Sequence, residues 1–325
     1  MFYKGETIYS HFLCIGFIFL LQSVPDTTRV IAQPGQKAPF ALFPPAKPVV
    51  DSQSILLKNA SVEESRPRVH AEVGRYRLRL AQDAGDREAA FRLRFRVFNI
   101  ELGEGLESSY ATGIDTDHFD VFCEHLLVEE KIAGRVVGTY RMQSGTTAAI
   151  NQGYYSAQEF EFAPYEPLRR DILELGRASI DREHRTPEVL TLLWRGIAQY
   201  ANNMGLRYLV GCSSLSSRNP AEGWQMYREL ERYRASPEFE TVPTPDYICP
   251  FEHQGSETQI DSGPQDLGSP TKVPKLLKTY LTIGARICAP PAWDREFGTI
   301  DFLTLLDLKM LSSAARNRFL APLSQ

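Results

Sequence analysis

Residues 173–212 constrain the fold of this 325-residue chain more than any other segment. Residues 173–180 (LELGRASI) and 207–212 (RYLVGC) have the apolar content of buried β-strands. Between them, apolar residues recur at helical spacing through 186–205, with a Thr-Pro pair at the start and a glycine at the end. Strands and helices that alternate in this way predict an α/β domain.

The flanking segments extend this domain in both directions. An amphipathic helix is predicted from Asp86, which suits its N-cap, to Leu102. The other predicted elements are strands at 76–80, 125–129, 135–142, 283–289 and 301–308 and a short helix at 275–281. This order predicts one mixed sheet with helices around it, in a single domain spanning residues 71–325, with a flexible polar loop at about 235–272.

The first 70 residues differ from the rest of the chain. Residues 8–21 are apolar but shorter than a membrane span, and residues 22–68 are rich in proline. We therefore expect residues 1–70 to form an apolar leader and a tether of low order. The leader is similar to the core of a signal peptide, yet only Lys4 precedes it and no cleavage motif follows.

The overall composition excludes several classes of function. The five cysteines are widely separated and form no C-x-x-C pair, which favours a reducing compartment and predicts neither a zinc site nor a disulfide framework. The net charge of -4 argues against general nucleic-acid binding. The sequence contains no G-x-S-x-G motif around its serine-rich segment 213–217, which argues against a serine hydrolase.

An acidic triplet, Asp115-x-Asp117-x-x-Asp120, precedes the predicted hairpin. Three carboxylates this close repel one another unless a cation, an ammonium group or several arginines offset their charge. Arg141, in the second hairpin strand, needs an anionic partner in an apolar sheet, and Asp117 or Glu174 suits that role. The alternative for the triplet is a solvated turn that caps a helix.

The strand at 173–180 carries Glu174 and Arg177, whose side chains would point to opposite faces of a regular strand. Gly176 lies between them, and a glycine inside a strand often marks a β-bulge. A bulge at Gly176 would turn both charges toward one pocket. Glu174 would then accept a proton from an amine, and Arg177 would keep it ionised or bind a substrate carboxylate. Without a bulge, one of the two lies on the exposed face.

The next loop, residues 181–188 (DREHRTPE), leads into the predicted helix. Backbone N–H groups at a helix N-terminus bind anions, and His184 and Arg185 add positive charge. The loop is therefore a candidate anion site, although charged loops of this kind are also common on protein surfaces.

Several of these segments together resemble known acyltransferases. The run R-x-x-x-F-N at 94–99, the D-x-D-x-x-D triplet, HLLV, GTYR and ELGR resemble the acyl-homoserine-lactone synthases. LELGRASIDREHR, GCSSL and PPAWDREFGTIDFLTLLDL resemble more closely the ornithine N-acyltransferases of ornithine-lipid synthesis, also called hemolysin-like proteins. Both groups belong to the GCN5-related N-acetyltransferase (GNAT) superfamily, and the resemblance covers residues 74–308.

The resemblance implies the GNAT fold, in which a bulged and splayed central strand, here 173–180, holds the pantetheine arm of an acyl thioester with its backbone amides. It implies transfer of a fatty acyl group, expected to be 3-hydroxylated, to the α-amine of L-ornithine, which gives lyso-ornithine lipid with no metal and no permanently bound cofactor. Asp117 and Asp120 are expected to hold the acceptor's ammonium groups, and Arg177 or Arg141 its carboxylate, unless these charges instead form a structural network.

The site residues that the resemblance implies fall into three groups. They are catalytic Glu174, Arg177 and Arg141; substrate-binding Asp115, Asp117, Asp120, Arg94 and Phe98; and donor-binding Ala178, Ser179, Ile180, His184 and Arg185.

One departure from the superfamily pattern favours a carrier protein as the donor. CoA users carry Q/R-x-x-G-x-G/A before the helix, whereas residues 182–187 read R-E-H-R-T-P, without glycine. We therefore expect acyl-ACP, which presents pantetheine without an adenosine diphosphate moiety, rather than acyl-CoA. The acidic carrier is expected to meet Arg92, Arg94, Arg96 and Arg185. The enzyme is expected in the cytoplasm, with peripheral attachment to the inner membrane left open because the product is an amphiphile.

Two other functions stay open. One is an acyl-homoserine-lactone or other N-acyl-amino-acid synthase, because the sequence does not decode the loops that select the acceptor. The other is a non-catalytic acyl-carrier or lipid-binding module on the same scaffold. The presence of Asp117, Arg141, Glu174 and Arg177 together argues against the second alternative.

Overall fold

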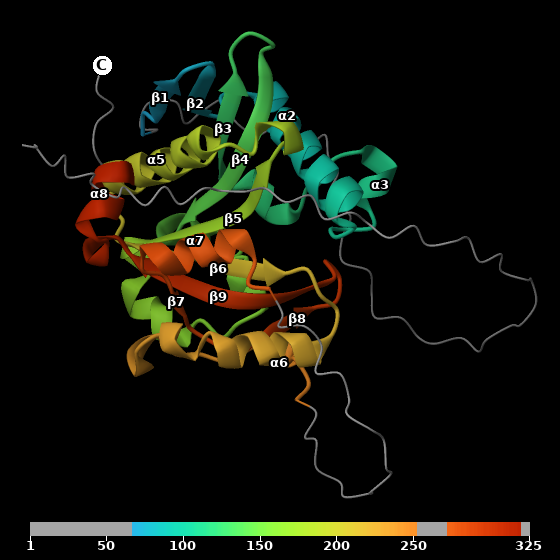
Figure 1. Cartoon of the computed structure of the whole chain (residues 1–325), viewed down its shortest axis with the longest axis vertical. Helices are drawn as coiled ribbons and strands as arrows, with labels where there is room; N and C mark the ends of the chain where they lie inside the picture. The colour runs from blue at the N-terminus through green and yellow to red at the C-terminus, as the bar shows by residue number, and fades with distance from the viewer. Residues whose placement is uncertain (1–66, 252–271, 320–325) are drawn as a thin grey trace, which may run out of the picture. The chain divides into compact units, whose positions relative to one another are not determined.

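The computed structural model describes residues 67–251 and 272–319. In these residues nine strands form one mixed sheet in the order β1-β2-β3-β4-β5-β6-β9-β7, with β8 paired to β9 (Figure 1). Residues 1–66, which make up nearly all of the predicted leader and tether, lie outside the described residues. Residues 252–271 of the predicted loop also lie outside them. Whether residues 71–325 form a single domain stays a prediction.

The strands follow the predicted segments closely where apolar alternation is strong. Their bounds are β1 His70–Val73, β2 Tyr76–Leu80, β3 Glu124–Glu130, β4 Arg135–Ser144, β5 Ile172–Ile180, β6 Tyr208–Leu215, β7 Arg286–Ile287, β8 Ala292–Asp294 and β9 Thr299–Asp307. The strand predicted at 283–289 is shorter than expected, because Gly284, with φ +116°, ends the preceding helix inside that range.

Seven α-helices are described, and short 3-10 turns connect many of the elements. The helices are α2 Ala84–Phe95, α3 Ser109–Thr112, α4 Gly145–Ile150, α5 Pro187–Asn203, α6 Pro220–Glu229, α7 Lys275–Ile283 and α8 Ser313–Phe319. Thr186 caps α5 through its side chain, as predicted. The described part of the predicted loop, residues 235–251, contains two 3-10 turns, Pro237–Phe239 and Pro245–Tyr247.

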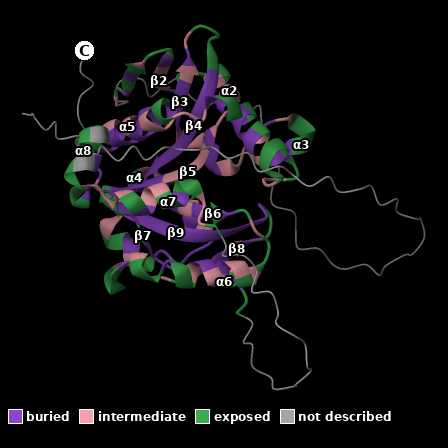
Figure 2. Ribbon diagram, viewed as in Figure 1, coloured by how far each residue is buried: buried purple, intermediate pink, exposed green. Residues whose placement is uncertain are grey.

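Helices cover both faces of the sheet, which buries its strands (Figure 2). In β3, Leu126 and Val128 pack in the cluster that contains α5, whereas Leu127 between them packs in the cluster that contains α2. Side chains of a strand alternate between faces, so α5 and α2 lie on opposite sides of the sheet. No helix in the described residues is long and apolar enough to cross a membrane.

The first helix departs from the prediction at both ends. Its N-cap is Asp83, whose side chain accepts the backbone N–H of Asp86; Asp86 lies inside the first turn and pairs with Arg79 instead. The α-helix ends at Phe95 and continues as a π-helix, Arg96–Leu102. The wider π turn displaces the apolar stripe, so the side chain of Leu102 is exposed.

The sheet is forked at its centre, between β5 and β6. β5 pairs with β4 on both sides of one irregularity, but its parallel pairing with β6 spans Ile172, Leu173 and Glu174 alone. β6 then stays paired with β9 as far as Leu215. Beyond Glu174, therefore, the edge of β5 that faces β6 has no strand partner among the described residues.

Candidate active site

A β-bulge in β5 re-aims the charged residues of this strand. Thr139 of β4 pairs with Ser179, and Arg141 pairs with Gly176, so Arg177 and Ala178 together oppose one residue of β4. The predicted bulge is therefore present. It lies at Arg177 and not at Gly176, because Arg177 has φ +51° and no other non-glycine residue in the described parts of the chain has a positive φ.

Gly176 is not what permits the bulge. A Cβ atom at this position would meet only the Nε and Nη2 atoms of Arg141, both at 3.9 Å, which is an ordinary contact. The left-handed conformation of Arg177 costs about 1–2 kcal/mol. Interactions of its guanidinium group must offset this cost.

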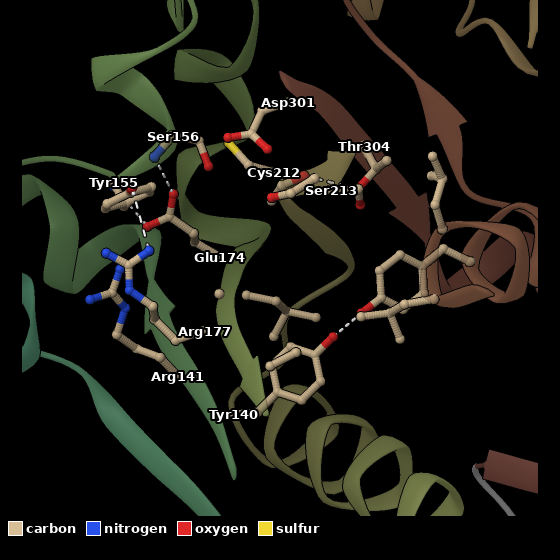
Figure 3. Close-up of a pocket in the computed structure, with 18 of the residues that line it drawn as sticks. Tyr140, Arg141, Tyr155, Ser156, Glu174, Arg177, Cys212, Ser213, Asp301 and Thr304 are labelled. Atoms are coloured by element: carbon tan, nitrogen blue, oxygen red, sulfur yellow. Dashed lines mark hydrogen bonds between the residues drawn. The ribbon is translucent and has the colours of Figure 1, made fainter. Parts of the chain in front are cut away.

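A cavity of about 250 Å³ occupies the fork between β5 and β6. Residues 175–178 line it from β5, and residues 211–214 line it from β6. Figure 3 shows Glu174, Arg141 and Arg177 on one side, with Cys212, Ser213 and Thr304 on the other. A cleft bounded by unpaired strand backbone can bind an extended chain through main-chain hydrogen bonds.

Glu174 is a buried carboxylate at the start of the fork, 5% exposed. Its Oε2 accepts the backbone N–H of Tyr155 at 2.9 Å, and its Oε1 accepts the backbone N–H of Ser156 at 2.8 Å. Burial raises the pKa of Glu174, while these two hydrogen bonds act in the opposite direction. The Ser156 side chain also interacts with Glu174, and a carboxylate has about four acceptor sites, so at least one site remains to accept a proton from a ligand.

Three arginines neutralise the predicted acidic triplet in a buried network. Arg94 bonds to Asp115 at 2.6 Å and holds Asp120 with two bonds, of 2.7 and 3.0 Å. Arg141 donates to both oxygens of Asp117, at 2.6 and 2.7 Å, as predicted for one of its two candidate partners. Burial acts to raise the pKa of Asp117, but the charges of Arg141, Arg177 and Arg94 together outweigh it and the pKa is lowered.

Arg177 links this network to the cavity. Its Nη2 donates to Asp117 Oδ2 at 2.9 Å, and its Nε lies 3.5 Å from Asp115 Oδ1. The guanidinium carbon lies 4.8 Å from the ring centre of Tyr155 and 4.7 Å from that of Phe297, so two aromatic rings hold it. These contacts offset the strained backbone of Arg177.

One branch of the cavity is apolar. Leu175, Trp194, Leu277 and Leu306 line it, and α7 brings Tyr280 over it. The hydroxyl groups of Tyr140 and Tyr280 form a hydrogen bond at this branch, and Figure 3 labels Tyr140 there. An apolar branch of this kind suits a hydrocarbon chain.

The opposite branch is acidic. Asp294 and Asp301 line it, and their carboxylates lie with that of Glu159 in a group whose ligand atoms are within 4.8 Å of one another. A second group of this kind, Asp181, Glu183 and His184, lies after β5. These are the positions in the described residues that could hold a cation.

Not all predicted site residues lie at the cavity. Phe98, Arg141, Glu174, Arg177 and Ala178 line it, whereas the predicted donor-binding residues Ser179, Ile180, His184 and Arg185 do not.

The two basic donor-binding residues are occupied elsewhere. His184 is buried, and its two ring nitrogens bond to Tyr76 and Arg135. Arg185 bonds to Glu101 and to the backbone oxygen of Ile180. His184 therefore has no free ring nitrogen for an anion.

Arg94 also departs from the prediction. Its side chain is fully buried, 0% exposed, so the prediction that it meets an acyl carrier protein is wrong. It supports the acidic triplet instead.

The sequence prediction missed several cavity residues. Tyr155 and Ser156 contribute through their backbone and follow no periodic pattern. Asp294, Phe297 and Asp301 lie in the segment PPAWDREFGTIDF, which resembles one family as a whole but indicates no role for a single residue. That specific stretch was the available signal.

Comparison with known proteins defines the class first. Residues 93–195 match the family model described as "Acetyltransferase (GNAT) domain". The crystal structure of the acyl-homoserine-lactone synthase LasI can be superimposed on 77% of this chain, which uses 98% of the LasI chain. The sequence identity is 12% and the TM-score is 0.44. The bulged and forked sheet and the matched domain identify a GNAT acyltransferase.

The particular family follows from the curated relatives. The L-ornithine N(alpha)-acyltransferase of Brucella abortus (strain 2308) is 30% identical over 263 residues, which is 76% of this chain and 92% of that protein. The acyl-homoserine-lactone synthase of Vibrio anguillarum is 28% identical over 99 residues, 30% of this chain and 49% of that protein. The chain belongs to the L-ornithine N(alpha)-acyltransferase family.

Proposed function

We propose that this protein transfers a fatty acyl group from a thioester to the α-amine of L-ornithine. The observation that carries the proposal is that the buried carboxylate of Glu174 and the unpaired edge of β5 border the same cavity. The name of the family supports ornithine as the acceptor.

Glu174 acts as the general base, directly or through a water molecule. The amine nitrogen attacks the thioester carbonyl carbon and forms the C–N bond, and Glu174 takes the proton that the nitrogen loses. The C–S bond then breaks, and the leaving thiolate takes the proton that Glu174 accepted, which returns the carboxylate to its ionised form. Backbone N–H groups of β5 stabilise the negative charge that develops on the carbonyl oxygen.

Arg177 is the better candidate for binding the acceptor's carboxylate. It lines the cavity, and its Nε makes no hydrogen bond within the described residues. Asp117 and Asp120 fit the alternative role of a structural network, because guanidinium groups already occupy their carboxylates. They hold Arg141 and Arg177 in position.

We propose acyl-ACP as the donor and a 3-hydroxyacyl chain as its cargo. The loop after β5 supports a donor without a diphosphate, because its backbone N–H groups are used locally. Those of Glu183 and His184 bond to Asp181, and that of Thr186 bonds to the His184 carbonyl. The amphiphilic product favours a peripheral position at a membrane surface.

Purified full-length protein tests the function directly. Incubated with 3-hydroxyacyl-ACP, it should release free thiol in an ornithine-dependent manner and form N-acyl-ornithine, detected by mass spectrometry. Expressed in a host without such lipids, it should yield a ninhydrin-positive, phosphate-free lyso-lipid. A diffusible acyl lactone, or thiol release that does not depend on any amino acid, would contradict the proposal.

A further inference from the structure

Two carboxylates line the acidic branch of the cavity and a third lies beside them, and no basic residue of the described ranges is seen to neutralise this group. Glu159, Asp294 and Asp301 are 1%, 4% and 3% exposed. No salt bridge joins any of them to a lysine or arginine of the described ranges. The triplet at the other side of β5 is equally acidic, yet each of its carboxylates has an arginine partner.

Several carboxylate oxygens of this group also lack hydrogen bonds. Both oxygens of Glu159 and Oδ1 of Asp301 lack a hydrogen bond of good geometry within the described residues, although Cys212 lies near Glu159. A buried carboxylate without a donor is costly, and neighbouring carboxylates add repulsion. In agreement, burial and the nearby carboxylates raise the pKa of Glu159 well above its usual value. The pKa of Asp301 is raised to about 6, and burial is the main cause. A positive charge placed among these oxygens would therefore stabilise the group.

Neighbouring side chains connect this group to the base. The backbone N–H of Ser156 donates to Glu174, and the Ser156 side chain also interacts with Cys212. Cys212 in turn interacts with Glu159 and Asp301. Figure 3 shows this arrangement: the side chains of Ser156 and Cys212 lie between those of Glu174 and Asp301.

We infer that Glu159, Asp294 and Asp301 bind the side-chain ammonium group of a diamino acid whose α-amine lies at Glu174. This inference rests on the proposed function and deepens it, because ornithine carries a second ammonium three methylene groups beyond its α-carbon. The three carboxylates are binding residues that select the acceptor.

An ammonium ion fits this group better than a metal ion. It has three N–H donors, one for each carboxylate. Asp294 Oδ1 already accepts the backbone N–H groups of Glu296 and Phe297, and Asp301 Oδ2 accepts the hydroxyl of Thr299. Few oxygens thus remain for calcium or magnesium, each of which takes six or more oxygen ligands.

The test compares ornithine with norvaline, which is the same amino acid without the side-chain amine. The wild-type protein should prefer ornithine by roughly 10⁴-fold in kcat/KM, because norvaline leaves the buried carboxylates unpaired. In the double variant Glu159→Gln/Asp301→Asn, this preference should fall at least about 100-fold, mostly through a higher KM for ornithine. The KM for the acyl donor should not change.

Two further measurements complete the test. Glu161→Gln removes an exposed charge two residues away and should keep the wild-type preference. The double variant should unfold at the same temperature as the wild type or a higher one, because it loses repulsion between carboxylates. Should it fail to fold, the single variant Glu159→Gln, which removes one buried carboxylate of the group, should show a smaller loss of the same preference, and an unchanged preference would overturn the site.

The outcomes separate this inference from the proposed function. A wild-type protein that acylates no amino acid overturns the function itself. One that acylates ornithine and norvaline equally well, or a double variant that keeps the full preference, overturns only the ammonium site. A stoichiometric metal in the purified wild-type protein that is lost in the double variant would also overturn it.

Discussion

At the scale of single residues, the carboxylate of Glu174 is subject to opposing influences. Burial raises its pKa, whereas the N–H groups of Tyr155 and Ser156 stabilise its charged form. The net effect is a raised pKa, which brings the proton affinity of Glu174 closer to that of an amine. A general base works best when its pKa approaches the working pH, so this environment suits the proposed role.

Replacing Glu174 by glutamine should lower kcat by about 10²–10⁴-fold, because an amide of the same size cannot take a proton. The base is active only when deprotonated, so the wild-type rate should fall as the pH drops through the raised pKa of Glu174. The pH profile of thiol release, measured between mildly acidic and mildly alkaline pH, checks both effects.

The same profile in the variant is the decisive comparison. Glu174→Gln should lose the acidic limb, and Glu161→Gln, at an exposed position, should retain it together with full activity. A variant that keeps both the limb and the rate would remove Glu174 from the chemistry.

At the scale of elements, Gly211 controls the fork between β5 and β6. A Cβ atom at Gly211 would lie 2.2 Å from the backbone oxygen of Leu175, a separation that packed atoms do not tolerate. Gly211→Ala should therefore force the strands apart, lower the free energy of unfolding by about 1–3 kcal/mol and raise the KM for the acyl donor. Denaturant unfolding and steady-state kinetics measure these two effects.

Gly176→Ala is the matched control in the neighbouring strand. Its Cβ would make ordinary 3.9 Å contacts, and the backbone of Gly176 has no positive φ. The free energy of unfolding should therefore change by less than about 0.5 kcal/mol. A loss as large as that of Gly211→Ala would mean that the bulge depends on Gly176 after all.

The elements show which features a sequence reveals. β4, β5 and α5 were predictable because apolar periodicity and local caps specify them. The π-helix after Phe95 was not, because its sequence keeps the spacing of an α-helix. Asp86 and Asp83 suit an N-cap equally by residue type, and only the backbone conformation decides between them.

The candidate site was predictable to a similar extent. The pair Arg141–Asp117 followed from the cost of a buried charge, and Glu174 from its place beside a proposed bulge. The group of Glu159, Asp294 and Asp301 could not be predicted in this way, because Glu159 is far in the chain from the segment that holds Asp294 and Asp301, and only the fold brings it beside them.

At the scale of the whole molecule, the arginines near the end of β5 are the surface that an acidic carrier protein would meet. Arg96 follows α2, is 47% exposed, and lies 3.6 Å from Asp181, directly after β5. Arg92, 57% exposed, pairs with Glu88 one turn earlier in the same helix. With Arg94 buried and Arg185 held by Glu101, these two are the members of the predicted set that remain most exposed.

The double charge reversal Arg92→Glu/Arg96→Glu should raise the KM for acyl-ACP by about 10-fold or more at low salt and leave kcat nearly unchanged, because rim charges act mainly on association. The KM for the same acyl group on CoA should stay within about two-fold, since CoA lacks the carrier's acidic surface. Added salt should raise the wild-type KM for acyl-ACP toward that of the variant, because it screens exposed charges beyond about 8–10 Å.

Arg228→Glu on α6 reverses an exposed charge elsewhere on the molecule. This control variant should change neither the KM for acyl-ACP nor the KM for acyl-CoA. If the double reversal left the KM for acyl-ACP unchanged, or if acyl-CoA were the better donor of the wild-type protein, the carrier would have to dock elsewhere or not at all.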